Sequence, residues 1–245
     1  MSEAPKLTPA NPGSGPISDP VTEPASSEQT PQEAEDLDSL ALSALISSRV
    51  CHDLINPVGA LSSGLEVLDD PAMEGAMHEA AMDLIRAGAK KAIALLSYAR
   101  LAYGAAGGFG AQISLEDAHK ALAGLFDITK ADLEWGVGNG LAAKENVKVL
   151  MVLAYAAADC VPRGGLVSVQ GDIENFTVTA TGKKLLLNED LVRVLGGDAK
   201  DLTPKNTPAL IAMQLAQATG GTITVKRTED EVIFTASLGK SVDNS

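Results

Sequence analysis

A histidine, an acid, an amide and a proline lie close together in the segment His52-Asp53-Leu54-Ile55-Asn56-Pro57-Val58. A neutral imidazole carries a nucleophilic lone pair near pH 7, and a neighbouring carboxylate can orient the ring or act as a base. The proline removes one backbone hydrogen bond, so a helix that retains it is usually kinked there. A lone exposed histidine on a helix is usually an ordinary surface residue, but an acid, an amide and a proline at these offsets favour a functional one.

The segment around His52 has the pattern of an amphipathic helix, expected over about residues 36–68. Small or apolar residues recur alternately after four and three positions, at Leu40, Ala44, Ser47, Cys51, Leu54, Val58, Leu61, Leu65 and Leu68. At 100° per residue, His52 points about 130° away from the centre of this stripe, and Asn56 points nearly opposite the stripe. The pattern therefore predicts that both side chains face solvent beside a helix bundle.

A second long helix is expected over about residues 72–103, after the polar turn Asp69-Asp70-Pro71. Its own apolar stripe consists of Ala81, Ile85, Gly88, Ala92, Leu95, Ala99 and Ala102. Two long helices joined by so short a loop form an antiparallel hairpin. One hairpin cannot cover both stripes, so the sequence predicts a homodimer in which two hairpins form a four-helix bundle.

The remaining segments divide the chain further. Residues 1–34 hold seven of the 12 prolines and almost no periodic apolar pattern, which predicts a disordered arm. The glycine-rich residues 105–110 are expected to be a hinge. Beyond it, alternating or β-branched runs predict strands at 133–137, 166–170, 176–180, 222–226 and 232–236. Helices are predicted at 115–126, after the capping residue Ser114, at 144–159, and from Thr203-Pro204 to Thr219.

The predicted fold class is therefore α+β. A helical hairpin over residues 35–104 forms a dimeric four-helix bundle, and an α/β sandwich with an antiparallel or mixed sheet follows over 111–240. The net charge of −13 argues against nucleic acid and against anionic membrane surfaces. The two cysteines have neither a disulfide framework nor a metal-type spacing. The longest apolar run, residues 149–158, is too short to span a bilayer, so a cytoplasmic location is expected.

The segment from His52 to Val58 resembles the phospho-acceptor box of sensor histidine kinases, which runs His, acid, apolar, any residue, Thr or Asn, Pro, apolar. The longer run from Arg49 to Ala60, followed by Gly64-Leu65-Glu66, resembles the ChpT-type histidine phosphotransferases of alphaproteobacteria. The similarity extends over about residues 38–240. It implies that His52 is the phospho-acceptor and that Asp53 orients the imidazole or serves as a base. Asn56 would either position a water for dephosphorylation or only contact the partner.

The second unit resembles the ATP-binding domain of histidine kinases but departs from it where chemistry is needed. The helix positions that normally supply asparagines to Mg²⁺ hold Val152 and Ala156, which offer no oxygen ligand. The adenine-reading Asp-x-Gly-x-Gly is replaced near Ala180-Thr181-Gly182-Lys183-Lys184, without an Asp. The phosphate-cradling Gly-x-Gly becomes Asn206-Thr207-Pro208, and the proline removes an amide donor. We therefore expect a degenerate domain that binds no ATP and no other cofactor.

The resemblance implies a histidine phosphotransferase in a multistep phosphorelay. The receiver domain of a hybrid histidine kinase (CckA-like) would pass a phosphoryl group to His52, which would pass it to response regulators (CtrA-like and CpdR-like). The Mg²⁺ would be supplied by the partner receiver domain. The expected receiver contact consists of Ile55, Gly59, Ser63 and Glu66, although an ordinary small-residue helix face would give the same pattern. Two alternatives stay open: an atypical ATP-using histidine kinase, and a non-catalytic dimeric signalling scaffold.

Overall fold

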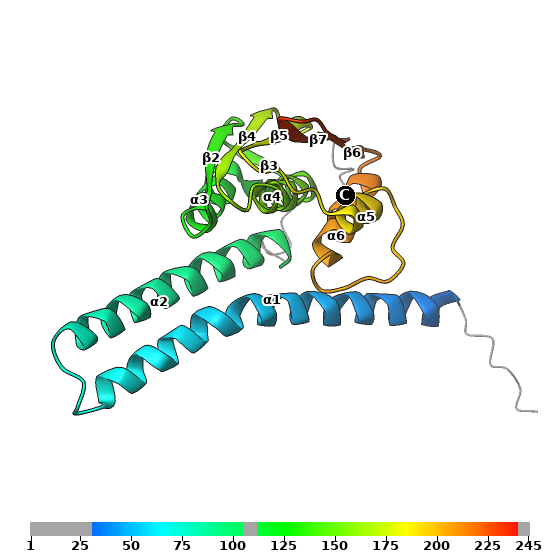
Figure 1. The fold of residues 1–245 in the computed structure, drawn as a ribbon. Helices are drawn as coiled ribbons and strands as arrows, with labels where there is room; N and C mark the ends of the chain where they lie inside the picture. The colour runs from blue at the N-terminus through cyan, green and yellow to red at the C-terminus, as the bar shows by residue number, and fades with distance from the viewer. Residues whose placement is uncertain (1–30, 105–111, 240–245) are drawn as a thin grey trace, which may run out of the picture.

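The computed structural model describes residues 31–104 and 112–239, with side chains from residue 39 onward. The expected hinge and nearly all of the expected N-terminal arm lie outside the described residues. Two long helices come first: α1 spans Pro31–Asp69, beginning earlier than expected, and α2 spans Ala76–Ala102. They lie side by side and antiparallel (Figure 1), so the predicted hairpin is confirmed.

The two helices of the hairpin approach each other closely at glycines. A Cβ atom added to Gly88 would lie 2.8 Å from the carbonyl oxygen of Pro57, and one added to Gly64 would lie 2.6 Å from Cγ1 of Ile85. Pro57 itself is buried inside α1, which continues through it without a break. The two halves of α1 follow different directions in Figure 1, in agreement with the expected kink.

The two apolar stripes of the hairpin are buried to different degrees. Every residue of the α2 stripe is buried or half-buried. On α1, by contrast, Leu54, Leu61 and Leu68 are half-buried, whereas residues on the other side of the stripe are exposed: Leu40 at 67%, Val58 at 52% and Leu65 at 53%. Single exposed apolar residues are ordinary, but a row of them along a helix marks an interaction surface. The single chain therefore leaves one apolar face of α1 uncovered.

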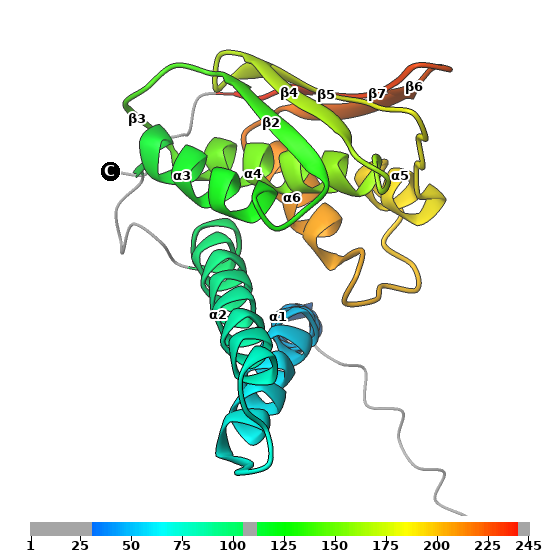
Figure 2. The ribbon, with the colours of Figure 1, turned by 60° about the vertical axis from the view of Figure 1, so that its left-hand side comes forward.

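A five-stranded sheet forms the far layer of the second domain (Figures 1 and 2), in the order β2-β4-β5-β7-β6. Its strands are β2 (Ala131–Gly136), β4 (Gly165–Gly171), β5 (Asn175–Thr181), β6 (Thr222–Arg227) and β7 (Glu231–Ser237). The β2–β4 pair is parallel and the other pairs are antiparallel, so of the two arrangements that the sequence left open the sheet is the mixed one. Two short strands, β1 (Gln112–Ser114) and β3 (Leu141–Ala143), form a separate antiparallel pair that the sequence did not predict.

Four helices cover one face of this sheet and separate it from the hairpin (Figure 2). They are α3 (Leu115–Phe126), α4 (Lys144–Asp159), α5 (Glu189–Leu195) and α6 (Thr207–Ala218). The hairpin contacts this helical layer, α2 against α3 and α4, and α1 against α6. The architecture is a helical hairpin followed by an α/β sandwich, as the sequence predicted.

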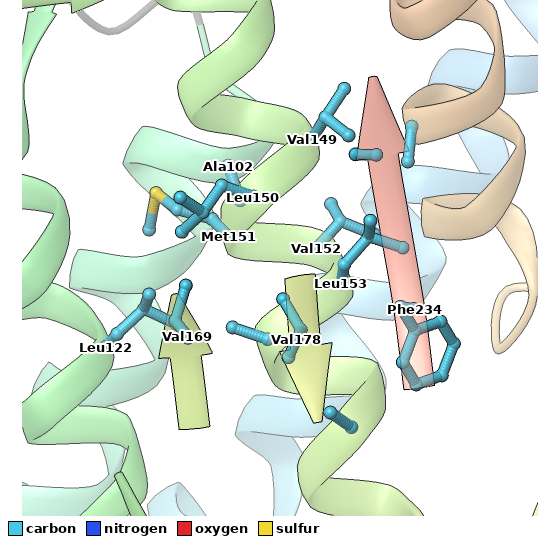
Figure 3. Packing of buried hydrophobic residues seen from close by; sticks show 14 of the residues in the cluster. Ala102, Leu122, Val149, Leu150, Met151, Val152, Leu153, Val169, Val178 and Phe234 are labelled. Atoms are coloured by element: carbon cyan, nitrogen blue, oxygen red, sulfur yellow. The ribbon is translucent and has the colours of Figure 1, made fainter. Parts of the chain in front are cut away.

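The centre of the second domain is α4, which is apolar nearly all round, as expected of a helix buried on several sides. Leu150, Met151 and Leu153 have no exposed surface. Figure 3 shows Leu153 beside Phe234 of β7 on one side, and Leu150 and Met151 near Ala102 of α2 on the other. Burying one such side chain contributes about 1.5–3 kcal/mol. This helix therefore holds the sheet and the hairpin in one structure.

Two further predicted helix starts are wrong: α2 begins at Ala76 rather than near residue 72, and α6 begins later than Thr203. The chain from Thr203 to Asn206 forms a turn, and α6 begins only at Thr207. Asn206 Oδ1 accepts a hydrogen bond from the Thr203 amide at 2.7 Å, and Thr207 Oγ1 donates one to the Thr203 carbonyl at 2.6 Å. These bonds hold the turn, and Pro208 rather than Pro204 occupies the first turn of the helix. The short helix α5, capped by Asn188, was not predicted.

Candidate functional site

His52 lies on the outer face of α1, and its side chain is 78% exposed. Asn56 is exposed on the same helix, as the spacing predicted. The four residues of the expected receiver contact are also exposed: Ile55, Gly59, Ser63 and Glu66. A Cβ atom added to Gly59 would meet nothing within 4 Å, so this part of the helix surface is open to an approaching molecule. The structure thus leaves the predicted acceptor and the surface below it accessible.

A row of three side chains leads from His52 back toward the second domain. Asp53 Oδ1 lies 3.4 Å from His52 Nδ1, and Arg49 Nε donates to Asp53 Oδ2 at 2.8 Å. The side chains of Arg49 and Asp53 are 13% and 20% exposed, so this ion pair is much less solvated than the histidine. Burial lowers the pKa of Arg49, but the Asp53 carboxylate together with Tyr103 and Tyr155 outweighs burial, and the net shift is upward. Arg49 is therefore a permanent cation here.

Sequence reasoning did not identify Arg49 as a site residue. The signal was present, because an arginine four residues before an acid on a helix can pair with it. Such pairs are common on helix surfaces, and nothing in the sequence indicated that this one would lie against another domain.

A cavity of about 650 Å³ opens beside these residues, between the hairpin and the second domain. Its hairpin side includes Arg49, His52 and Asp53 of α1, and its opposite side includes Tyr155 and Asp159 of α4. The loop before α6 closes another side, where it approaches α1 in Figure 1. Because the walls come from both domains, the cavity exists only in the assembled tertiary structure.

Two of the three segments that depart from the ATP-binding pattern come together on this cavity, whereas residues 180–184 contribute nothing to its lining. Val152, Ala156, Asn206 and Pro208 all belong to its lining. Val152 is only 3% exposed and packs into the core, and the side-chain oxygen of Asn206 accepts a hydrogen bond from Thr203. The wall at which a nucleotide and its metal would need oxygen ligands is thus apolar or already hydrogen-bonded.

The cavity interior favours uncharged side chains. Tyr98 makes edge-to-face contacts with Tyr103 and Tyr155, with ring centroids 5.6 and 5.0 Å apart. Burial raises the pKa of Tyr103 to about 12, and it also raises the pKa of Tyr98 and Tyr155. Burial likewise raises the pKa of the Asp159 carboxyl, an effect that Arg49 and Lys205 oppose. The cavity is therefore a poorly solvated, aromatic space beside an exposed imidazole.

The other two histidines have structural partners elsewhere. His78 Nδ1 donates to the Met73 carbonyl at 2.7 Å, and the His119 ring stacks on Trp135 at 4.9 Å. Neither histidine lines the cavity. Within residues 31–104 and 112–239, no three His, Cys, Asp or Glu side chains gather as metal ligands do, and no helix is long and apolar enough to cross a membrane.

Comparison with known proteins identifies relatives that match most of the chain. The family model for the histidine phosphotransferase C-terminal domain matches residues 115–231. Protein phosphotransferase ChpT of Brucella abortus (strain 2308) is 34% identical over 206 residues, which cover 82% of this chain and 97% of that protein. A structure described as a bacterial phosphotransferase, solved at 1.7 Å, matches with a TM-score of 0.72 and 32% identity, covering 80% of this chain and 96% of the other.

Proposed function

Because this chain belongs to the family of ChpT-type histidine phosphotransferases, we propose that His52 is the residue that accepts and donates the phosphoryl group. The protein is a phosphotransferase of a phosphorelay, and its partners are histidine kinases and response regulators. The observation that carries the role of His52 is its environment. Among the three histidines, His52 combines an exposed ring with a carboxylate directed at Nδ1 and an open surface below it.

The chemistry requires little beyond positioning. The Nε2 lone pair of the neutral imidazole forms the N–P bond while the O–P bond to the receiver's aspartate breaks, and the aspartate leaves as a carboxylate. The ring gains a positive charge, which Asp53 stabilises through Nδ1–H until that proton is released to water. The receiver domain supplies the Mg²⁺ that neutralises the phosphoryl oxygens. Asn56 either positions a water for dephosphorylation or contacts the partner.

The phosphoryl donor is another protein rather than ATP. Three observations support this: Val152 and Ala156 stand where oxygen ligands for Mg²⁺ are needed, and Pro208 stands where a backbone amide would cradle phosphate. All three line the cavity beside His52. The specific partners that we propose are the receiver of a CckA-like hybrid kinase and CtrA-like and CpdR-like response regulators, in the cytoplasm. They dock on the surface formed by Ile55, Gly59, Ser63 and Glu66.

The hairpins of two chains pair into a four-helix bundle. Support comes from the uncovered apolar face of α1, which carries Leu40, Val58 and Leu65, and from the exposed Ile93 and Leu96 of α2. Burying these residues against a second copy would stabilise the dimer by about 25 cal/mol for each Å² of apolar surface removed from water. In such a bundle, His52 stays on the outer face, away from the stripe.

The deciding experiment is phosphotransfer profiling with purified, radiolabelled receiver domains. The wild-type protein should take label from at least one receiver and pass it to another. His52→Ala should take up none, while His78→Ala and His119→Ala should transfer as the wild type does. The circular dichroism spectrum of His52→Ala should be unchanged, because an exposed side chain contributes little to packing.

Three results would contradict the proposal. Label uptake by His52→Ala at the wild-type rate would remove His52 from the reaction. Label taken from ATP in the absence of any receiver would instead indicate an atypical histidine kinase. A folded dimer that takes label from neither source would indicate a signalling scaffold.

A further inference from the structure

Arg49 connects the second domain to the acceptor histidine. It lies three residues before His52, pairs with Asp53 at 2.8 Å and is largely shielded from solvent, with 13% of its side chain exposed. Most exposed ion pairs on helices are solvated and contribute less than about 1 kcal/mol. This pair differs from them because its arginine lies in the wall of a cavity between two domains.

The opposite wall of the cavity presents groups that favour a cation at this position. Asp159 and Tyr155, both on α4, line the same cavity as Arg49. The charge of Arg49 acts on both, since it opposes the upward shift that burial gives to the pKa of each. Arg49 therefore experiences Asp53 on its own helix and the side chains of α4 across the cavity.

The pairing also limits how Asp53 can move. A carboxylate with one oxygen fixed by Arg49 can turn only a little, and its other oxygen then faces His52 Nδ1 at 3.4 Å. That distance is at the long end of a hydrogen bond. In proteins without bound partner, catalytic hydrogen bonds are often long and tighten only in the reacting complex. A fixed carboxylate is ready to make the shorter bond once a receiver docks.

We propose that Arg49 is a positioning residue for phosphotransfer, which holds Asp53 so that His52 keeps its proton on Nδ1 and presents the Nε2 lone pair to the receiver. This role rests on the proposed function of His52. The second domain contributes to this positioning because α4 and the loop before α6 shield Arg49 from water. In water the attraction between Arg49 and Asp53 would be weaker. The domain thus contributes to phosphotransfer through the packing of the cavity, without binding a nucleotide.

The state of the His52 ring gives the first test, and it needs no receiver. The chain has three histidines, so ring ¹⁵N spectra contain few signals, and His52→Ala identifies those of His52. His78 is an internal reference for a protonated Nδ1, because it donates from that atom to the Met73 carbonyl. Wild-type His52 should show a protonated Nδ1 and an unprotonated Nε2. Arg49→Ala should shift both signals toward those of a free side chain, and Arg49→Lys should restore them in part.

The rate of transfer gives the second test, in single-turnover reactions with saturating phosphorylated receiver. Arg49→Ala should lower the rate constant at least about tenfold while receiver affinity stays within about twofold, since a small misplacement of a catalytic group is costly. Arg49→Lys should recover most of the loss. The matched control is Arg86→Ala, which removes the same side chain from an exposed ion pair with Asp83 on α2 and should transfer normally.

A double-mutant cycle separates positioning from general destabilisation. If Arg49 acts through Asp53, then adding Arg49→Ala to Asp53→Ala should change the rate constant by less than about twofold. The positioning role would be overturned if the double variant were slower than Asp53→Ala by the full factor that Arg49→Ala shows alone. It would also be overturned if Arg49→Ala weakened receiver affinity and left the rate constant unchanged. An unchanged His52 spectrum in Arg49→Ala would overturn it as well. If the spectra change as expected but the wild type takes phosphate from no receiver, the proposed function fails and the positioning of the ring stands.

Discussion

The hairpin and the α/β domain meet at one cavity and line it with different sets of residues. The hairpin supplies ionisable groups, with His52 largely exposed and its carboxylate partner on the same helix. The α/β domain supplies Tyr155 and Asp159, and also Val152, Ala156 and Pro208 at the positions where the sequence resemblance to histidine kinases would place Mg²⁺ and phosphate. Val152 is 3% exposed, so at this position the wall not only lacks an oxygen ligand but is also packed into the hydrophobic core. We propose that this fold has persisted without the ATP chemistry, because packing and site residues are separable.

The largest expected effect tests whether the hairpin needs a second copy. Leu65→Asp places an unpaired charge on the uncovered face of α1, which should weaken the dimer by about 3 kcal/mol or more, or about a hundredfold in dissociation constant. Light scattering at micromolar concentration measures it. Because Leu65 is 53% exposed in the single chain, the monomer should stay folded. Ser48→Asp, at an exposed position on the same helix, is the control. A wild-type protein that is already monomeric would refute the dimer.

The next effect compares two glycines on the hairpin. Gly88→Ala should destabilise the fold by about 1–3 kcal/mol, because the added methyl group would meet the Pro57 carbonyl. Gly59→Ala should stabilise it by up to about 1 kcal/mol, because alanine favours helix and the methyl group meets nothing. Urea unfolding monitored by circular dichroism gives both values. Equal effects would mean that the hairpin is packed differently from the structure described here.

Gly59 also sharpens the assignment of the receiver contact. A large residue at this position, as in Gly59→Leu, should leave the fold intact and reduce phosphotransfer, since it would fill the space that a docked receiver needs. Unchanged transfer by Gly59→Leu would show that this row of small residues is an ordinary helix surface.

A smaller effect is expected at Asn56. Asn56→Ala should slow transfer to His52 by no more than about tenfold, equivalent to about 1.4 kcal/mol, because geometry and charge come mostly from the receiver. Quenched-flow measurement of label uptake tests this, with Ser62→Ala on the exposed surface of α1 as control. A loss of several hundredfold would place Asn56 in the chemical step.

The last prediction is that added nucleotide has no measurable effect. Titration calorimetry with ATP or ADP, with and without Mg²⁺, should show no binding up to millimolar nucleotide, since Val152, Ala156 and Pro208 offer neither ligand oxygens nor a free amide. A micromolar dissociation constant for ATP or ADP would show that the α/β domain has kept a nucleotide site, and it would favour an ATP-using kinase.

Periodicity made most of the fold predictable. The helix α4 occupies residues 144–159 as expected, because its continuous apolar run is too long for a strand. The five predicted strands agree with the observed ones to within about two residues. The short elements β1, β3 and α5 were missed because three to seven residues are too few to establish a period. The start of α6 was placed too early because two prolines competed for the first turn, and side-chain hydrogen bonds decided between them.

The sequence by itself determined where His52 and Asn56 lie on α1, because their spacing along the helix fixes which face they occupy. It also determined that Val152 and Ala156 offer no ligand to Mg²⁺, since a side chain without an oxygen cannot bind this ion in any fold. Only the tertiary structure decided that those positions meet His52 at one cavity and that Arg49 is shielded within it. Such facts depend on contacts between residues more than a hundred positions apart, and no local pattern records which distant surfaces will pack together.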